Sequence, residues 1–178
     1  MNAHVKTLKT LCKRKASQST EADALILKWV NQLLSKASDI LEKYISNHAE
    51  ANKDVNFTTP PPKSGSRMGK KASARSKSLS RAITAAYTIG SLILICPSAD
   101  MTTIVPLLHT IITSGNRDLK SNKLPIQTAS LKETAPSLYI QAWLTMGKIC
   151  LTDEKRAKSY IPLFVQVKCR ISGLISLM

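Results

Sequence analysis

The chain carries one glycine–proline pattern twice, and this repeat restricts its fold more than any other feature. In the first copy Gly90 lies within an apolar run, and Pro106 follows sixteen residues later. In the second copy Gly147 lies within an apolar run, and Pro162 follows fifteen residues later. Each copy predicts two helices joined by a tight turn, a unit that cannot bury its apolar surface alone. The repeat therefore predicts an α-solenoid, with these four residues serving the packing of the repeats.

A long amphipathic helix is expected before the repeats. The segment Thr20–Asp23 resembles a capping box and directly precedes a run with helical periodicity. The apolar stripe of this helix is expected to comprise Ala22, Ile26, Trp29, Leu33, Ala37, Ile40 and Tyr44. Because these positions recur at steps of three and four, the sequence predicts a helix over residues 19–51.

The remaining helices are expected to form two antiparallel pairs, over residues 79–114 and 136–168. Pro106 is placed about one turn inside its helix, where it predicts a kink or the loss of one hydrogen bond. Asp153 and its neighbours predict the start of the last helix. No long stretch alternates with period two, so the sequence predicts an all-α fold without a sheet. The expected segments are a basic N-terminal segment (1–18), the long helix (19–51), a disordered linker (52–75), the helical repeats (76–168) and a divergent tail (169–178).

The linker concentrates the positive charge of the chain. The sequence has 26 basic and 11 acidic residues, a net charge of +15, and no acidic residue between Asp54 and Asp100. Such a balance favours an acidic partner such as nucleic acid, although a solvated basic surface is the alternative. Phosphate contacts are expected from Lys63, Arg67, Lys70, Lys71, Arg75, Lys77 and Arg81. No aromatic residue is interleaved from Thr58 to Ala86, so we expect sequence-independent binding of duplex DNA rather than base stacking.

Two hydroxyl residues in this region are candidate phosphorylation sites. Thr59 precedes Pro60, a minimal proline-directed site, and Ser78 has Arg75 three residues before it. A phosphate at either position would add about −1.5 to −2 charge beside the basic run and weaken its hold on DNA.

Catalytic and metal-binding chemistry finds no support in the sequence. The three histidines are scattered, and the four cysteines show no C-x-x-C spacing. Neither Gly90 nor Gly147 belongs to a nucleotide-binding motif. The most apolar run, Ala82–Cys96, is shorter than the roughly 20 residues that span a bilayer. The chain is therefore expected to be a soluble non-enzyme without a cofactor, a small-molecule substrate or a membrane partner.

Residues 138–166 carry a resemblance to a known family. The run LYIQAWLTMGKICLTDEKRAKSYIPLFVQ resembles the HEAT-repeat core of the D-type non-SMC subunit of condensin, and the condensin II version more closely. The resemblance implies a HEAT-like α-solenoid that acts as a scaffold or regulatory subunit in mitotic chromosome condensation. It further implies kleisin and SMC subunits and chromatin as partners, in the nucleus and on chromosomes. After Gln166 the sequence departs from the family, so a truncated fragment is expected.

A second function remains open on the sequence alone. A generic α-solenoid adaptor that binds a protein partner, of the import-receptor or trafficking type, fits the same repeat logic. Salt-dependent, sequence-independent binding of DNA would favour the hypothesis of a condensin subunit.

Overall fold

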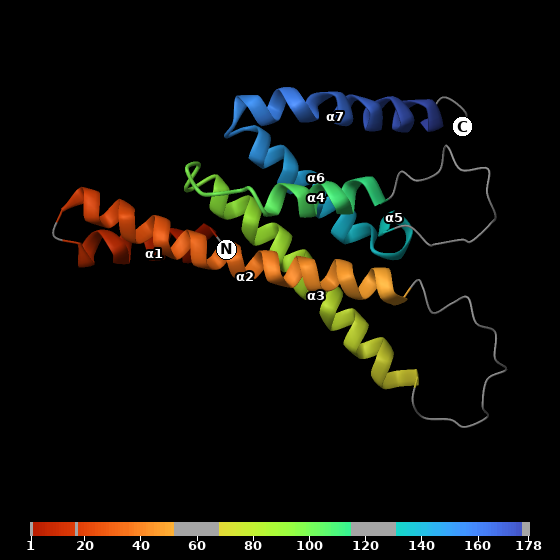
Figure 1. The fold of residues 1–178 in the computed structure, drawn as a ribbon, viewed down its shortest axis with the longest axis horizontal. Coiled ribbons are helices and arrows are strands. Elements are labelled where there is room, and N and C mark those ends of the chain that lie inside the picture. Colours follow the sequence, from red (N-terminus) through yellow and green to blue (C-terminus); the bar gives the residue numbers. More distant parts are fainter. Residues whose placement is uncertain (1, 17, 52–67, 115–130, 176–178) are drawn as a thin grey trace.

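A computed structural model describes residues 2–16, 18–51, 68–114 and 131–175 of the chain. Throughout these ranges the regular structure is helical, which confirms the predicted all-α class (Figure 1). The helices are α1 (Asn2–Lys15), α2 (Ser19–Ala51), α3 (Met68–Ile93), α4 (Ile104–Ser114), α5 (Leu131–Thr134), α6 (Pro136–Cys150) and α7 (Glu154–Ile175). In this part of the chain, each helix is too short or too polar to cross a membrane.

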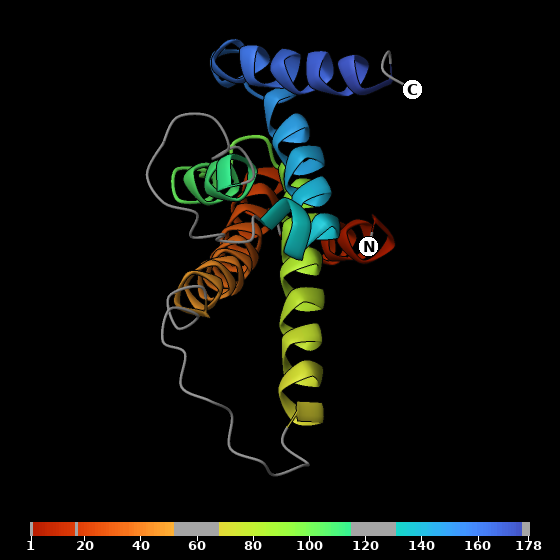
Figure 2. The ribbon, with the colours of Figure 1, turned by 90° about the vertical axis from the view of Figure 1, so that its right-hand side faces the viewer.

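The helices form two crossing rows. From bottom to top, Figure 1 shows α2, α4 and α7, and Figure 2 shows α6 following the line of α3 across them. α3 packs mainly against α2 and α6, while α4 packs against α6. α6 therefore connects the two expected repeat units, and its apolar side faces a core of aliphatic side chains such as Ile89, Leu108 and Met146.

The buried side of α2 differs from the predicted stripe. Trp29, Leu33 and Ile40 were expected in the core, but their exposed fractions are 48%, 37% and 38%. At these three steps the core is instead formed by residues one position later in the chain: Val30 (1%), Leu34 (2%) and Leu41 (0%). The other four residues of the predicted stripe are buried as expected: Ala22, Ile26, Ala37 and Tyr44. Both sets have helical spacing, because α2 carries two apolar stripes offset by one residue. Periodicity alone could not indicate which stripe faces the core.

The second difference lies at the start of α3. This helix begins at Met68 rather than at Ser76, so residues 68–75 are helical and were wrongly assigned to the disordered linker. These residues are rich in alanine, lysine and arginine, which favour helix formation, and the prolines end at Pro62. The rest of the expected linker, residues 52–67, lies outside the described residues.

The ends of α4 and α7 depend on local side-chain chemistry. Asp153 caps α7, as predicted, by accepting a hydrogen bond of 3.2 Å from the backbone N–H of Arg156. Because α4 begins only at Ile104, Pro106 lies in its first turn, where a missing N–H breaks no helical hydrogen bond. The kink expected at Pro106 is therefore not required. Pro162, by contrast, lies inside α7, which extends to Ile175 instead of ending near residue 168.

Candidate nucleic-acid interface

The cationic residues singled out in the sequence gather on the N-terminal half of α3. Arg75, Lys77 and Arg81 are exposed on this helix. Lys70 and Lys71 lie near its start, where only the backbone is described, and Lys63 and Arg67 lie outside the described residues. A helix therefore fixes the spacing of the charges from Lys70 onward. The sequence had predicted that most of the cationic residues lie in a disordered linker.

A groove between α2 and α3 brings part of this charge together. It has a volume of about 380 Å³, and both helices contribute to its walls. Its lining residues are Ile40, Lys43, Asn47, Ala74, Lys77, Ser78 and Arg81. Three of them are cationic and none is acidic, so the groove attracts anions.

Lys43 is a groove residue that the sequence analysis did not identify. It lies on α2, far from the basic run in sequence. Its place beside Lys77 and Arg81 depends on the packing of α2 against α3. No local sequence signal indicates that packing.

Arg75 adds its charge to the end of α2. Burial, together with the positive charge of Arg75, lowers the pKa of His48. Burial raises the pKa of Tyr44, and Arg75 partly opposes this change. The His48 ring also lies 2.9 Å from the Thr134 hydroxyl, measured from Nε2 to Oγ1, which links α2 to α5. The electrostatic influence of Arg75 therefore reaches side chains of the neighbouring helix.

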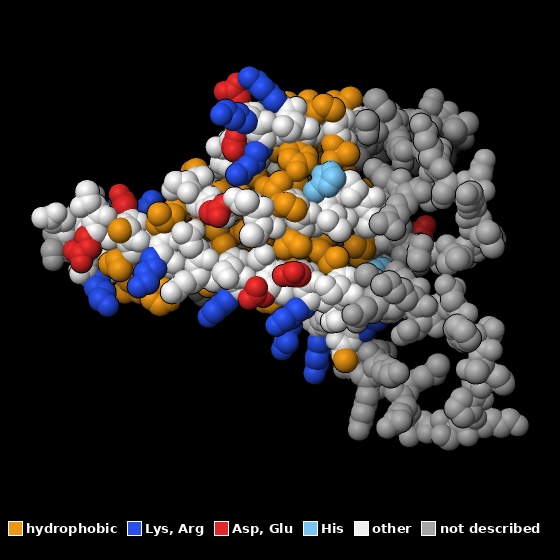
Figure 3. Space-filling model, in the orientation of Figure 1, with side chains coloured by type: hydrophobic (Ala, Val, Ile, Leu, Met, Phe, Trp, Pro, Cys, Tyr) orange, Lys and Arg blue, Asp and Glu red, His pale blue; other side chains and the backbone are white. Residues whose placement is uncertain are grey.

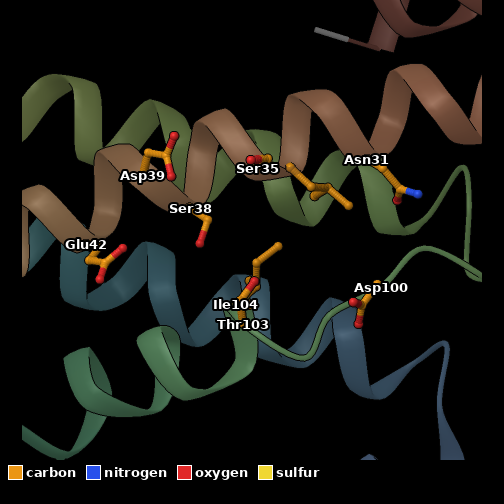
Figure 4. Close-up of a pocket in the computed structure, with 9 residues that line it drawn as sticks. Asn31, Ser35, Ser38, Asp39, Glu42, Asp100, Thr103 and Ile104 are labelled. Carbon is orange, nitrogen blue, oxygen red and sulfur yellow. The ribbon is translucent and has the colours of Figure 1, made fainter.

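The opposite flank of α2 is acidic. A second groove, with a volume of about 390 Å³, is lined by Asp39 and Glu42 of α2 and by Asp100 from the turn before α4 (Figure 4). Hydrogen bonds from Thr102 lower the pKa of Asp100. Among the described residues, no group of three His, Cys, Asp or Glu side chains is arranged to hold a metal ion. This flank repels phosphates, so the charge of α2 is divided between two sides.

The surface shows the same division. Figure 3 shows Lys and Arg side chains along the lower edge of the molecule, over α1, α2 and α3, with acidic side chains above them. A polyanion that follows the lower edge would meet positive charge while avoiding the acidic groove between α2 and α4.

The two candidate phosphorylation sites have different positions. Ser78 is half-buried on α3 and lines the cationic groove. Thr59 lies outside the described residues.

The residues assigned to repeat packing also differ in their surroundings. At Gly90, a Cβ atom would lie 3.0 Å from the Lys148 side chain and 3.2 Å from the Thr145 hydroxyl. Thr145 is fully buried and donates a hydrogen bond of 2.9 Å to the carbonyl of Ala86, which joins α6 to α3. At Gly147 the nearest atom would be 4.0 Å away, on Phe164. Only the first glycine lies at a close approach of two helices.

Comparison with known proteins identifies relatives of the chain. Residues 76–167 match the family model described as condensin-2 complex subunit D3-like, HEAT repeats. The condensin-2 complex subunit CAP-D3 of Arabidopsis thaliana is 57% identical over 167 residues, which cover 93% of this chain and 12% of that protein. No solved structure matches the chain.

Proposed function

Because the chain belongs to the condensin-2 complex subunit D3-like family of HEAT-repeat proteins, we propose that it serves as a non-catalytic scaffold segment of a condensin II complex. The relative with 57% identity bears the name of a condensin-2 subunit, and the chain spans only 12% of its length. In this proposal the partners are SMC and kleisin subunits, the place of action is the nucleus and the chromosome, and the process is mitotic chromosome condensation.

The segment also contacts duplex DNA, in this proposal, through the positive charge at the start of α3. The observation that carries this step is the groove in which Lys43, Lys77 and Arg81 face the same space with no acidic residue among its lining. Arg75 lies exposed on the same half of α3. Phosphates bind such charges regardless of base sequence. The proposed contacts are Lys63, Arg67, Lys70, Lys71, Arg75, Lys77, Arg81 and, from the structure, Lys43.

Phosphorylation is proposed to weaken this contact. A phosphate on Ser78 would bring negative charge into the groove that Lys43, Lys77 and Arg81 line, and would therefore compete with DNA phosphates. A phosphate on Thr59 would act in the same direction from the preceding segment. Equal affinity of the phosphorylated and unmodified chains for DNA would exclude this regulation.

Electrophoretic mobility shift with two unrelated duplexes of equal length tests the DNA contact. The parent chain is expected to bind both duplexes within about twofold, and Lys70→Ala/Lys71→Ala/Arg75→Ala is expected to weaken both equally. The matched control removes three lysines elsewhere, as Lys13→Ala/Lys132→Ala/Lys155→Ala. If the two triple variants bind alike, Lys70, Lys71 and Arg75 at the start of α3 make no contact with DNA phosphates.

A generic protein-binding adaptor is the second candidate function. The exposed apolar side chains of α2 favour it, because such side chains gain little from phosphates. A chain that binds no duplex DNA at low salt would support this adaptor function over the DNA contact.

A further inference from the structure

The outward face of α2 carries large apolar side chains that remain exposed in the folded chain. Trp29, Leu33 and Ile40 are separated by four and seven residues, which places them on one side of the helix. Lys36 lies between Leu33 and Ile40, and Lys43 follows Ile40. The two lysines are seven residues apart, so they share this side of the helix. From Trp29 to Lys43 this face extends about 21 Å along the helix axis. We call these five residues the outer α2 face.

The outer α2 face runs into the cationic groove. Ile40 and Lys43 belong to both, and Lys77 and Arg81 of α3 form the far wall of the groove. The acidic residues Asp39 and Glu42 lie on the other flank of α2, where they line the separate groove near α4. The outer face therefore combines apolar anchors with positive charge, and Asp39 lies at its edge, three residues after Lys36 and four before Lys43.

We propose that the outer α2 face and the adjoining groove bind an acidic amphipathic helix of a protein partner. The row of Trp29, Leu33 and Ile40 along α2 suits a partner helix that carries apolar side chains at positions i, i+4 and i+7 on one side. Exposed tryptophan and arginine are the side chains that most often dominate protein interfaces. Acidic side chains of the bound helix pair with Lys36, Lys43, Lys77 and Arg81. The proposed helix and the proposed DNA contact share Lys43, Lys77 and Arg81, so the two ligands compete for this groove.

Other occupants suit the face less well. The phosphate backbone of DNA can pair with the lysines, but it leaves Trp29 and Leu33 uncovered. A second copy of the chain also carries a net charge of +15, so the two copies repel each other. An acidic helix with an apolar side satisfies both the charge and the apolar area.

A defined peptide tests the proposal on the full chain of 178 residues. The probe is a labelled peptide of about 18 residues, which as a helix spans about 27 Å. It has leucine at positions i, i+4, i+7 and i+11 and glutamate and alanine elsewhere. A second peptide has the same composition in scrambled order. Binding is measured by fluorescence anisotropy, and helix content by circular dichroism.

The ordered peptide is expected to bind the parent chain at least about tenfold more tightly than the scrambled one. Trp29→Ala and Lys43→Glu are each expected to weaken its binding about tenfold or more. Leu144→Ala and Lys155→Glu are the matched controls, because they change an exposed leucine of α6 and an exposed lysine of α7. Both are expected to bind within about twofold of the parent, and all four variants are expected to keep the parent helix content.

Three results overturn the proposal. The first is equal binding of the ordered and scrambled peptides, or of Trp29→Ala and the parent. The second is that Trp29→Ala weakens duplex DNA binding but leaves peptide binding unchanged, which assigns the face to DNA. The third is that the parent chain dimerises and Trp29→Ala makes it monomeric, which assigns the face to a second copy.

Discussion

At the scale of single residues, the two glycines of the repeat have unequal roles although the sequence presents them as equivalent. Gly90 lies where α3 and α6 approach closely, beside a buried hydrogen bond from Thr145 to Ala86. Gly147 faces Phe164 at an ordinary contact distance. The sequence marks both positions, but only the packing of α6 on α3 determines which of them tolerates a side chain.

Substituting each glycine by alanine is expected to change stability in opposite directions. Gly147→Ala gains helix propensity and is expected to raise the free energy of unfolding by up to about 1 kcal/mol. Gly90→Ala gains the same propensity but pushes on Thr145 and Lys148, so a net loss of about 1 to 2 kcal/mol is expected. Urea denaturation of both variants measures these changes. A more stable Gly90→Ala variant would contradict the close approach.

Trp143 provides a second test at this scale. Its ring packs 5.1 Å from that of Phe164, between ring centroids, and its indole N–H is buried without a hydrogen-bond partner among the described residues. Trp143→Phe removes this unsatisfied donor and keeps most of the contact, so a loss below about 1.5 kcal/mol is expected. Trp143→Ala leaves a cavity and is expected to cost about 3 to 5 kcal/mol. Similar losses in thermal or urea unfolding would show that the indole N–H is satisfied in solution.

At the scale of the elements, sequence reasoning succeeded where one signal dominated. The first helix of the pair expected over residues 136–168 is observed as α6, from Pro136 to Cys150, because a proline at the first position and a continuous apolar run agree. It was wrong for three of the seven residues expected on the buried side of α2, where two apolar stripes compete, and for the start of α3, where helix propensity exceeds the effect of charge. The cationic groove could be predicted only in part, because Lys43 reaches it through tertiary packing.

The contact between the ends of α2 and α3 makes a pH-dependent contribution to stability. The pKa of His48 is lowered in the folded chain, by burial first and by Arg75 second. The unfolded chain therefore binds a proton at a higher pH than the folded chain does. This contribution is fully present above about pH 6.5, the unperturbed histidine value, and is lost as the pH falls through the lower folded pKa.

The expected result is a smaller loss of stability on acidification when this histidine is replaced. The free energy of unfolding of the parent is expected to fall between about pH 7.5 and pH 5.5, and His48→Gln is expected to show a smaller fall. Urea denaturation at the two pH values measures both. Because the charge of Arg75 also lowers the pKa of His48, Arg75→Ala is expected to reduce the fall in the free energy of unfolding as well. Identical pH dependence in the parent and His48→Gln would exclude this role for His48.

At the scale of the whole molecule, the segment has a division of surfaces that its net charge does not reveal. Positive charge lies at the junction of α2 and α3, while acidic side chains line the groove between α2 and α4 (Figures 3 and 4). The central claim is that the first of these surfaces holds duplex DNA through several phosphates at once. The family membership supports a role in a condensin complex, and the cationic groove supports the contact with DNA phosphates.

The salt dependence of duplex DNA affinity tests this claim most directly. If about five phosphate contacts form, the logarithm of the association constant is expected to fall with the logarithm of salt concentration at a slope of about −4 to −5. Lys43→Ala/Lys77→Ala/Arg81→Ala, which removes the three positive charges of the groove, is expected to flatten that slope by about 3 and to leave the helix content unchanged. A triple variant that keeps the parent slope and affinity would contradict the claim and place any DNA contact elsewhere on the solenoid.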